Sequence, residues 1–278
     1  MNVLITGKHS YVGNHVGTYL SDASINVKYV SLRGKDWETF DFSQYDAIFH
    51  VAGIAHVPIK KTNESLYEDV NHQLTAQLAK KAKSEGIKHF IFMSSIMVYG
   101  AQPMIDDTSR PQPNNAYGVS KWDAEKALKK FESQSFKVSI IRAPMIYGAN
   151  AEGNFIRLYK LGLKWPIWPY YDNKRSMLYI DNLSMFIKHV IESQASGVFH
   201  PQNSAPTDTL SLIKLIRKKH GKKTWVIKGF SPIIKGLKKV SQSVNKMFGD
   251  YLIVSQKDVL KTYYSLEKSI QVMETPDV

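Results

Sequence analysis

The feature that most constrains the fold of this chain is an alternation, through its first half, of short apolar runs with segments of helical spacing. The runs are expected to form strands at Asn2–Thr6, Val27–Ser31, Ala47–Val51, His89–Ser94 and Val138–Arg142. Helices are expected at Val12–Leu20, Leu66–Lys83 and Tyr117–Phe131. Strands that alternate with helices form a parallel sheet with both faces covered. The pattern therefore predicts an α/β fold with a doubly wound parallel sheet, whose ligand binds at the carboxyl ends of the strands.

The pattern becomes looser in the second half. Further elements are expected at Tyr179–Ile191 (helix), Val198–His200 (strand) and from about Leu210 onward (a basic helical region). We therefore expect residues 1–148 to form the domain of the parallel sheet, to which 176–195 returns. Residues 149–278 are expected mainly to form a smaller C-terminal lobe.

Composition excludes several classes of protein. Of 278 residues, 43% are hydrophobic and none is cysteine, which excludes disulfides and thiolate metal sites. The nine histidines lack the spacing of metal ligands, so no metal site is expected. The first residues lack the features of a signal peptide, and no apolar run approaches the roughly 18 residues that span a bilayer. A cytoplasmic globular protein is expected.

The net charge of +13 is concentrated in one C-terminal segment. No acidic residue lies between Asp208 and Asp250, whereas eleven basic residues do: Lys214, Arg217, Lys218, Lys219, Lys222, Lys223, Lys228, Lys235, Lys238, Lys239 and Lys246. Within this segment, Ser231–Gly249 mixes apolar residues with lysines. We favour an amphipathic helix that covers the lobe with a solvated lysine face over a peripheral contact with an anionic membrane. Nucleic-acid binding is not expected, because no nucleic-acid motif accompanies the charge.

The segment TGKHSYVG, Thr6–Gly13, connects the first strand to the first helix. Gly7 permits a tight turn, Gly13 lets the helix pack close to the sheet, and a helix N-terminus holds a pyrophosphate. Ser10 stands where a third glycine is usual, and its small hydroxyl side chain is compatible with a phosphate. The residues expected to bind a dinucleotide are Gly7, Lys8, His9, Ser10, Tyr11, Val12 and Gly13.

Two further motifs predict proton-transfer chemistry. Tyr117 and Lys121, in AYGVSK, lie four residues apart at the start of an expected helix and so share one face. The pKa of an unperturbed tyrosine is about 10, and a nearby ammonium group favours its phenolate, so this pair suits proton transfer to or from a sugar oxygen. Ser95, in FMSSIMVYG, follows a strand and is expected to orient the same oxygen. Ile96 and Met97 after it are expected to contact the substrate.

A strand-end serine, then tyrosine and lysine one turn apart, resembles the catalytic set of the short-chain dehydrogenase/reductase superfamily. Over most of its length the chain resembles an extended member, of the NAD-dependent epimerase/dehydratase group. The resemblance implies that 1–148, with 176–195, form a Rossmann-type dinucleotide-binding domain and that 149–278 form mainly a smaller C-terminal substrate-binding lobe. It also implies that Ser95, Tyr117 and Lys121 are catalytic. The implied cofactor contacts beyond the glycine loop are Val51, Ala52 and Gly53 in HVAG, Asn71, Pro144, Met145, Tyr117 and Lys121. The implied contacts with the diphosphate of a nucleotide sugar are Asn154, in GNF, and Arg175, in KRSMLYIDNL.

The end of the second strand distinguishes between cofactors. An acidic residue there would bind the ribose 2′-hydroxyl of NAD, but this chain has Ser31, and Arg33 follows. The residues therefore favour NADP(H) over NAD(H).

The segments GNFIRLYKL and GVFHPQNS are similar to proteins of bacterial capsule and O-antigen sugar biosynthesis. Among these, the chain resembles reductases of UDP-4-keto-6-deoxy-N-acetylhexosamines. The resemblance implies an NADPH-dependent 4-ketoreductase of a UDP-sugar, in which Tyr117 donates the proton and Lys121 lowers its pKa. It also implies a homodimer. The alternatives are an NAD-dependent 4-epimerase of a UDP-hexose or UDP-N-acetylhexosamine, and a non-catalytic NADP-binding regulator, a type of protein that commonly lacks the tyrosine or the lysine.

Overall fold

The chain folds into two compact units. The computed structural model describes residues 1–55, 64–254 and 264–275. The first unit comprises 1–101, 109–143 and 183–201, and the second comprises 102–108, 144–182 and 202–278. The late segment that returns to the first unit is thus 183–201, where the sequence suggested 176–195.

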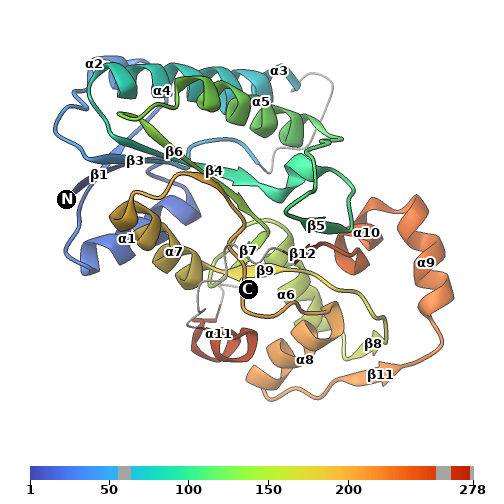
Figure 1. Ribbon diagram of the computed structural model, residues 1–278. Coiled ribbons are helices and arrows are strands. Elements are labelled where there is room, and N and C mark those ends of the chain that lie inside the picture. The colour runs from blue at the N-terminus through green and yellow to red at the C-terminus, as the bar shows by residue number, and fades with distance from the viewer. Residues whose placement is uncertain (56–63, 255–263, 276–278) are drawn as a thin grey trace. The chain divides into compact units, whose positions relative to one another are not determined.

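A six-stranded parallel sheet forms the centre of the first unit (Figure 1). Its strand order is β10-β6-β4-β3-β1-β2. The strands are β1 (Asn2–Thr6), β2 (Asn26–Val30), β3 (Ala47–His50), β4 (His89–Ser95), β6 (Lys137–Ala143) and β10 (Gly197–Phe199). The strands β3 and β4 are almost entirely buried, as expected for near-continuous apolar runs in a parallel sheet. The prediction of a doubly wound parallel sheet is confirmed.

Helices cover both faces of this sheet. The helices α4 and α5 lie over one face, and α1 and α7 over the other (Figure 1). The helices of the unit are α1 (Tyr11–Asp22), α2 (Asp36–Thr39), α3 (Glu64–Tyr67), α4 (Leu74–Ser84), α5 (Ala116–Phe131), α7 (Ile180–Ser193) and the short 3₁₀ helix η3 (Ile96–Tyr99). The helix expected over Leu66–Lys83 is interrupted by a π-helical turn, η2 (Glu68–Gln73). Such turns are frequent at functional sites.

The order of the strands reverses between β1 and β3, because the chain moves outward from β1 to β2 and then returns to β3. The two strands are in register, with Thr6 beside His50 at their carboxyl ends. The glycine loop follows Thr6 and the HVAG segment begins at His50. Both predicted cofactor segments therefore meet at the switch point, which is where sheets of this kind bind their ligands.

The described strands of the second unit form short pairs. The parallel pairs are β5 with β12, β7 with β9, and β8 with β11. Its strands are β5 (Met104–Asp106), β7 (Met145–Tyr147), β8 (Ile167–Pro169), β9 (Met177–Tyr179), β11 (Trp225–Ile227) and β12 (Leu252–Val254). Its helices are α6 (Asn154–Lys164), α8 (Thr209–Lys219), α9 (Ser231–Val240), α10 (Gln242–Phe248) and α11 (Leu266–Val272).

The basic segment over Ser231–Gly249 differs from the single covering helix that the sequence suggested. It forms two helices, α9 and α10, separated at Ser241, whose side chain caps α10 by accepting a hydrogen bond from the Val244 amide. Only Ile234 of α9 is buried. Among the described residues, no helix is both long and apolar enough to cross a bilayer.

Candidate functional site

The glycine loop forms a close-fitting turn between β1 and α1. Gly7 has a φ of +83°, and a Cβ on it would lie 3.1 Å from the Ala52 backbone nitrogen. Ser10 caps α1: its Oγ accepts a hydrogen bond of 2.9 Å from the Gly13 amide. A Cβ on Gly13 would lie only 2.6 Å from that Oγ. The serine that replaces the usual glycine thus orders the helix N-terminus, and its hydroxyl proton can still be donated to an anion.

The HVAG segment is held against this loop by Thr6. The Thr6 Oγ1 accepts hydrogen bonds of 3.2 Å from the backbone amides of Val51 and of Ala52. Gly53 is equally constrained, since a Cβ there would lie 2.8 Å from the Asn71 Oδ1 and 3.4 Å from the Lys121 Nζ. The two backbone segments form a cradle without room for added side chains, which fits the close approach of a dinucleotide.

A buried histidine fixes the positions of these elements. His50 Nδ1 lies 2.7 Å from the Thr6 Oγ1, and its Nε2 lies 2.8 Å from the Thr75 Oγ1. Thr75 donates its hydroxyl proton to the Asn71 carbonyl at 2.8 Å, so its oxygen accepts a hydrogen bond from His50 Nε2. The Thr6 Oγ1 accepts from two amides and donates its own proton to Nδ1. The ring proton is therefore assigned to Nε2. Burial, aided by the charge of Lys121, lowers the pKa of His50 to about 3. His50 is therefore neutral at physiological pH.

This depressed pKa predicts a loss of stability in mild acid. The unfolded chain protonates His50 below about pH 6.5, whereas the folded chain does not until about pH 3, so the free energy of unfolding falls as pH falls between these values. From pH 7 to pH 5.5 we expect His50 alone to remove about 1 kcal/mol. Urea denaturation of His50→Gln should show a shallower pH dependence by that amount, while Thr75→Val, which keeps the imidazole, should retain the slope. If the pH dependence of the free energy of unfolding were the same in His50→Gln as in the unmodified chain, the depressed pKa of His50 would be contradicted.

Asn71, predicted to contact the cofactor, is fully buried in the π-helical turn. Its Oδ1 accepts a hydrogen bond of 2.9 Å from the Ile54 amide, and its Nδ2 donates to the Ile54 carbonyl and to the Ser120 Oγ. Ser120 in turn donates to the Tyr117 carbonyl at 2.9 Å. Asn71 therefore links the HVAG segment to the start of α5. Its predicted contact with the cofactor stays a prediction.

The start of α5 packs directly on η3. Asn115 caps α5 by accepting from the Gly118 amide at 2.9 Å. A Cβ on Gly118 would lie 2.5 Å from the Met97 carbonyl oxygen, so only glycine permits this approach. The contact places Tyr117, the residue before Gly118, beside Ser95, which ends β4 and whose Oγ accepts from the Met97 amide at 3.2 Å.

The pKa of Tyr117 is set by its burial and by two neighbouring side chains, Ser95 and Tyr67. Burial is the largest influence on the phenol and raises the pKa of Tyr117 to about 12, while Ser95 lowers it and the neighbouring Tyr67 raises it. The Tyr67 ring meets Tyr117 edge-on, with centroids 6.2 Å apart. The phenol is thus protonated at neutral pH.

Lys121 is buried one turn after Tyr117. Its Nζ donates to the Met93 carbonyl at 2.9 Å and lies 4.6 Å from the centre of the Phe92 ring. Burial lowers the pKa of Lys121 to about 8, although Glu125 opposes this shift. The contributions to the pKa of Tyr117 come from burial, Ser95 and Tyr67, so the lowering by Lys121 that the sequence suggested stays a prediction.

A buried ion pair that the sequence did not reveal lies next to these residues. Arg142 donates three hydrogen bonds to Glu125, from Nη2 to Oε2 at 2.6 Å and from Nε to each carboxylate oxygen at 3.1 Å. Ser94, which precedes Ser95, donates to Glu125 at 2.5 Å, and the Arg142 Nη1 donates to the Tyr99 hydroxyl at 2.5 Å. The network joins β4, α5, β6 and η3. The available signal was the placement of Glu125 four residues after Lys121, on the same helix face.

Arg33, the predicted reader of a 2′-phosphate, is exposed beyond the end of β2. Ser31 directly follows β2, and its Oγ accepts a hydrogen bond of 3.2 Å from the Arg33 amide. Lys8 and His9, from the glycine loop, are likewise exposed. No acidic side chain stands at the Ser31 position, so the local charge is compatible with a phosphate.

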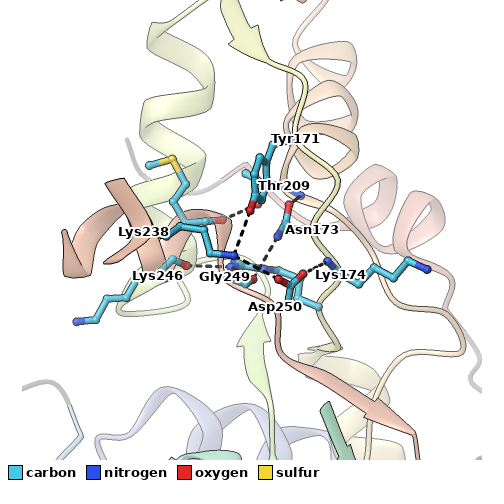
Figure 2. Close-up of polar contacts among 10 residues, drawn as sticks. Tyr171, Asn173, Lys174, Thr209, Lys238, Lys246, Gly249 and Asp250 are labelled. Carbon is cyan, nitrogen blue, oxygen red and sulfur yellow. Dashed lines mark hydrogen bonds and ion pairs between the residues drawn. The ribbon is translucent and has the colours of Figure 1, made fainter. Parts of the chain in front are cut away.

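Ile96, predicted to contact the substrate, is buried in η3 of the first unit, whereas four other predicted residues belong to the second unit. Pro144 and Met145 begin its segment 144–182, with Met145 in β7, and Asn154 is the first residue of α6, after Gly153 with a φ of +84°. Arg175 is buried, and its Nη2 donates to the backbone carbonyls of Lys246 (2.9 Å) and Gly249 (3.3 Å). Figure 2 shows this cluster of residues around Gly249 and Asp250. The Nε of Arg175 is buried and has no hydrogen-bond partner within the described part of the chain.

Comparisons with known proteins agree with this geometry. The model of the NAD dependent epimerase/dehydratase family matches residues 3–200. A UDP-glucose 4-epimerase of Vibrio cholerae is 34% identical over 190 residues, 64% of this chain and 58% of that protein. An N-acetyl-alpha-D-glucosaminyl-diphospho-ditrans,octacis-undecaprenol 4-epimerase of Escherichia coli O157:H7 is 30% identical over 217 residues, 70% of this chain and 65% of that protein. The chain thus matches somewhat less than two thirds of the length of these curated relatives.

Solved structures share the fold across both units. A UDP-glucuronic acid 4-epimerase of Bacillus cereus, in complex with NAD, has a TM-score of 0.75 at 19% identity and covers 98% of this chain and 97% of its own. A dTDP-4-dehydrorhamnose reductase of Bacillus anthracis, in complex with NADP, has a TM-score of 0.73 at 20% identity and covers 97% of both chains. At these identities the likeness establishes the fold, and the family follows from the match over residues 3–200. The chain belongs to the NAD dependent epimerase/dehydratase family.

Proposed function

We propose that the chain is an enzyme that transfers hydride between a nicotinamide dinucleotide and C4 of a hexose carried on a diphosphate. The observation that carries this proposal is the placement of Tyr117 beside Ser95 at the carboxyl end of β4, with Lys121 buried one turn further along α5. The cradle formed by Gly7, Gly13 and the HVAG segment supports the choice of cofactor.

The roles of the residues follow from their chemistry. A bound nicotinamide would accept or supply the hydride. Tyr117 Oη would take a proton from the sugar O4 as the C4–H bond breaks, and return one as that bond forms, while Ser95 Oγ holds the same oxygen. With a pKa of about 12 the phenol is ready to donate. To accept a proton it must become a phenolate, and we propose that the ammonium of Lys121 stabilises that anion.

We place 4-epimerisation first among the possible reactions. The two curated relatives described above, at 34% and 30% identity, are both named 4-epimerases. In such a reaction hydride leaves C4 and returns to its other face, so no nicotinamide is consumed. The sugar carriers in their names differ, since one is a nucleotide and the other is a lipid diphosphate.

The second candidate is reduction of a 4-keto sugar by NADPH, the reaction that the sequence favoured. The observation for it is the end of β2, where Ser31 and the exposed Arg33 would tolerate a 2′-phosphate that an acidic residue would repel. The solved reductase with a similar fold is a complex with NADP, while the epimerase is a complex with NAD.

One experiment separates the two reactions. The purified chain is incubated with NAD⁺ and UDP-glucose or UDP-N-acetylglucosamine, and the C4 epimers are resolved by NMR. In parallel it is incubated with a UDP-4-keto-6-deoxy-N-acetylhexosamine and NADPH or NADH, and absorbance at the nicotinamide band is followed. New epimer without net nicotinamide consumption supports epimerisation, and stoichiometric consumption supports reduction. If neither assay shows turnover, a lipid-diphosphate sugar is tested as the substrate. The absence of turnover with all three classes of substrate overturns the proposal.

Arg33 is expected to determine cofactor preference. If its guanidinium binds a 2′-phosphate, Arg33→Ala should raise the Kd of NADPH roughly tenfold, as loss of a charge-assisted hydrogen bond near the surface would, and leave the Kd of NADH unchanged. Arg33→Lys, which keeps the charge but loses the planar fork, should have an intermediate effect. Fluorescence titration measures both constants. Equal changes for the two cofactors would show that Arg33 does not read the phosphate.

A further inference from the structure

Exposed apolar side chains are concentrated in one part of the second unit. Of the sixteen large apolar side chains that are exposed among the described residues, ten lie in 165–170 and 225–240. Trp225 is 64% exposed and Val240 is 82% exposed. Isolated exposed apolar residues are ordinary, but a concentration of this size marks a surface that contacts something else.

The pairing of β8 with β11 brings part of this set together. Trp225 lies directly beside Ile167 in the parallel register, and both side chains are exposed. The Trp225 amide donates to the Pro166 carbonyl at 2.8 Å, and the Tyr170 amide donates to the Ile227 carbonyl at 2.8 Å. These bonds hold the exposed residues on one small, ordered sheet.

The orientation of α9 is fixed by its inner side. Ile234 packs with Tyr171 and Phe248 in a small buried cluster. One turn later, Lys238 donates to the Tyr171 hydroxyl at 3.2 Å and pairs with Asp250 at 3.3 Å (Figure 2). Asp250 also accepts from the Lys174 amide at 2.8 Å. The inner side of the helix is therefore anchored to the rest of the unit.

The outer side of α9 carries an apolar stripe. Ile233, Leu237 and Val240 follow one another at helical spacing, and all three are exposed. At the start of the helix, the Ser231 Oγ donates to the Tyr170 carbonyl at 3.4 Å, which joins α9 to the end of the β8–β11 pair. We call the exposed surface of β8, β11 and α9 the docking face.

The stretch of chain that carries most of the docking face is rich in exposed cations. No acidic residue occurs between Asp208 and Asp250. The exposed lysines of this stretch that follow α8 are Lys222, Lys223, Lys228, Lys235, Lys239 and Lys246. Lys238 is not among them, because it is paired with Asp250. The exposed lysines occur in the same part of the unit as exposed tryptophan and tyrosine, which are residue types enriched where a bilayer meets water.

We propose that the docking face binds the surface of an anionic lipid bilayer, with its apolar side chains entering the headgroup region and its lysines meeting lipid phosphates. The charge complements such a surface, and each lysine near it strengthens binding roughly fivefold. A second copy of this chain is the alternative occupant. A two-fold interface, however, would place the same lysine-rich surface on both sides and bring like charges together.

The test uses the purified full chain without substrate or cofactor, so its failure does not bear on the proposed reaction. Sedimentation is measured with vesicles of phosphatidylcholine alone and with 30% phosphatidylglycerol, at 150 mM and 500 mM salt. We expect binding to the anionic vesicles at 150 mM salt, weakened at least tenfold at 500 mM. Lys235→Glu/Lys239→Glu should weaken binding at least tenfold, and Ile233→Ser/Leu237→Ser should also weaken it.

A matched charge reversal on the first unit controls for net charge. Lys80 and Lys130 are exposed lysines of α4 and α5, and Lys80→Glu/Lys130→Glu should retain binding. No binding to anionic vesicles at 150 mM salt overturns the proposal, and so does an equal loss in both double charge reversals. A dimer in analytical ultracentrifugation that Ile233→Ser/Leu237→Ser dissociates would assign the face to a second copy instead.

Discussion

Replacement of Tyr117 by phenylalanine is expected to lower kcat by roughly 10²–10⁴-fold while leaving nucleotide affinity unchanged. The substitution removes only the hydroxyl, whose pKa Ser95 lowers, and keeps the ring that packs against Tyr67. Without that hydroxyl the sugar oxygen has no positioned proton donor or acceptor. Single-turnover kinetics with the substrate identified by the assays above measures the loss, and fluorescence titration measures nucleotide affinity.

Tyr67→Phe is the matched control. It removes a neighbouring hydroxyl that raises the pKa of Tyr117, so kcat should stay within a few-fold and the rising limb of its pH profile should move to lower pH. The direction follows because proton abstraction requires the phenolate, whose fraction increases with pH up to the pKa. If Tyr117→Phe and Tyr67→Phe reduced kcat equally, Tyr117 would not be the proton-transfer group.

The parts of the molecule that the sequence predicted are those set by local patterns. The strands β1, β3 and β4 were found because buried parallel strands are continuous apolar runs bounded by glycine or polar residues. The spacing of Tyr117 and Lys121 on α5 likewise follows from helical geometry alone. The glycine loop was recognised despite Ser10, because the two flanking glycines are the positions where the backbone tolerates no Cβ.

The parts that the sequence did not predict depend on contacts between distant segments. The π-helical turn at Glu68–Gln73 has no local sequence signature. The turn carries Asn71, whose hydrogen bonds reach Ile54 and Ser120 in distant parts of the chain. The apolar stripe on α9 was expected to be buried against the lobe. An amphipathic pattern, however, shows only that one face of a helix is apolar and does not show what that face contacts. Whether that face meets the lobe is decided by the inner contacts of Ile234 and Lys238.

Arg142 and Glu125 illustrate the same limit, and they give the largest expected effect on stability. Their side chains are 6% and 0% exposed. Glu125→Ala would leave the guanidinium buried without its carboxylate, and breaking a buried pair in this way costs about 3–5 kcal/mol. That is a large part of the roughly 5–15 kcal/mol that stabilises a typical protein. Urea denaturation at pH 7 should show this loss as a lower midpoint with an unchanged m-value.

A double variant separates the cost of the unpaired charge from the loss of packing. Glu125→Leu/Arg142→Met removes both charges at similar volume, and it should recover most of the stability lost in Glu125→Ala, because the desolvation of two ions is avoided as well. The Tyr99 hydroxyl keeps its partner His200 at 2.8 Å in this variant. Its activity should nevertheless stay low, since Glu125 favours the charged form of Lys121, and without that carboxylate the pKa of Lys121 falls further below its ordinary value. A double variant as unstable as Glu125→Ala would show that the network stabilises the fold through shape and not through charge. Recovery of stability together with full activity would show that Lys121 needs no carboxylate to remain an ammonium beside Tyr117.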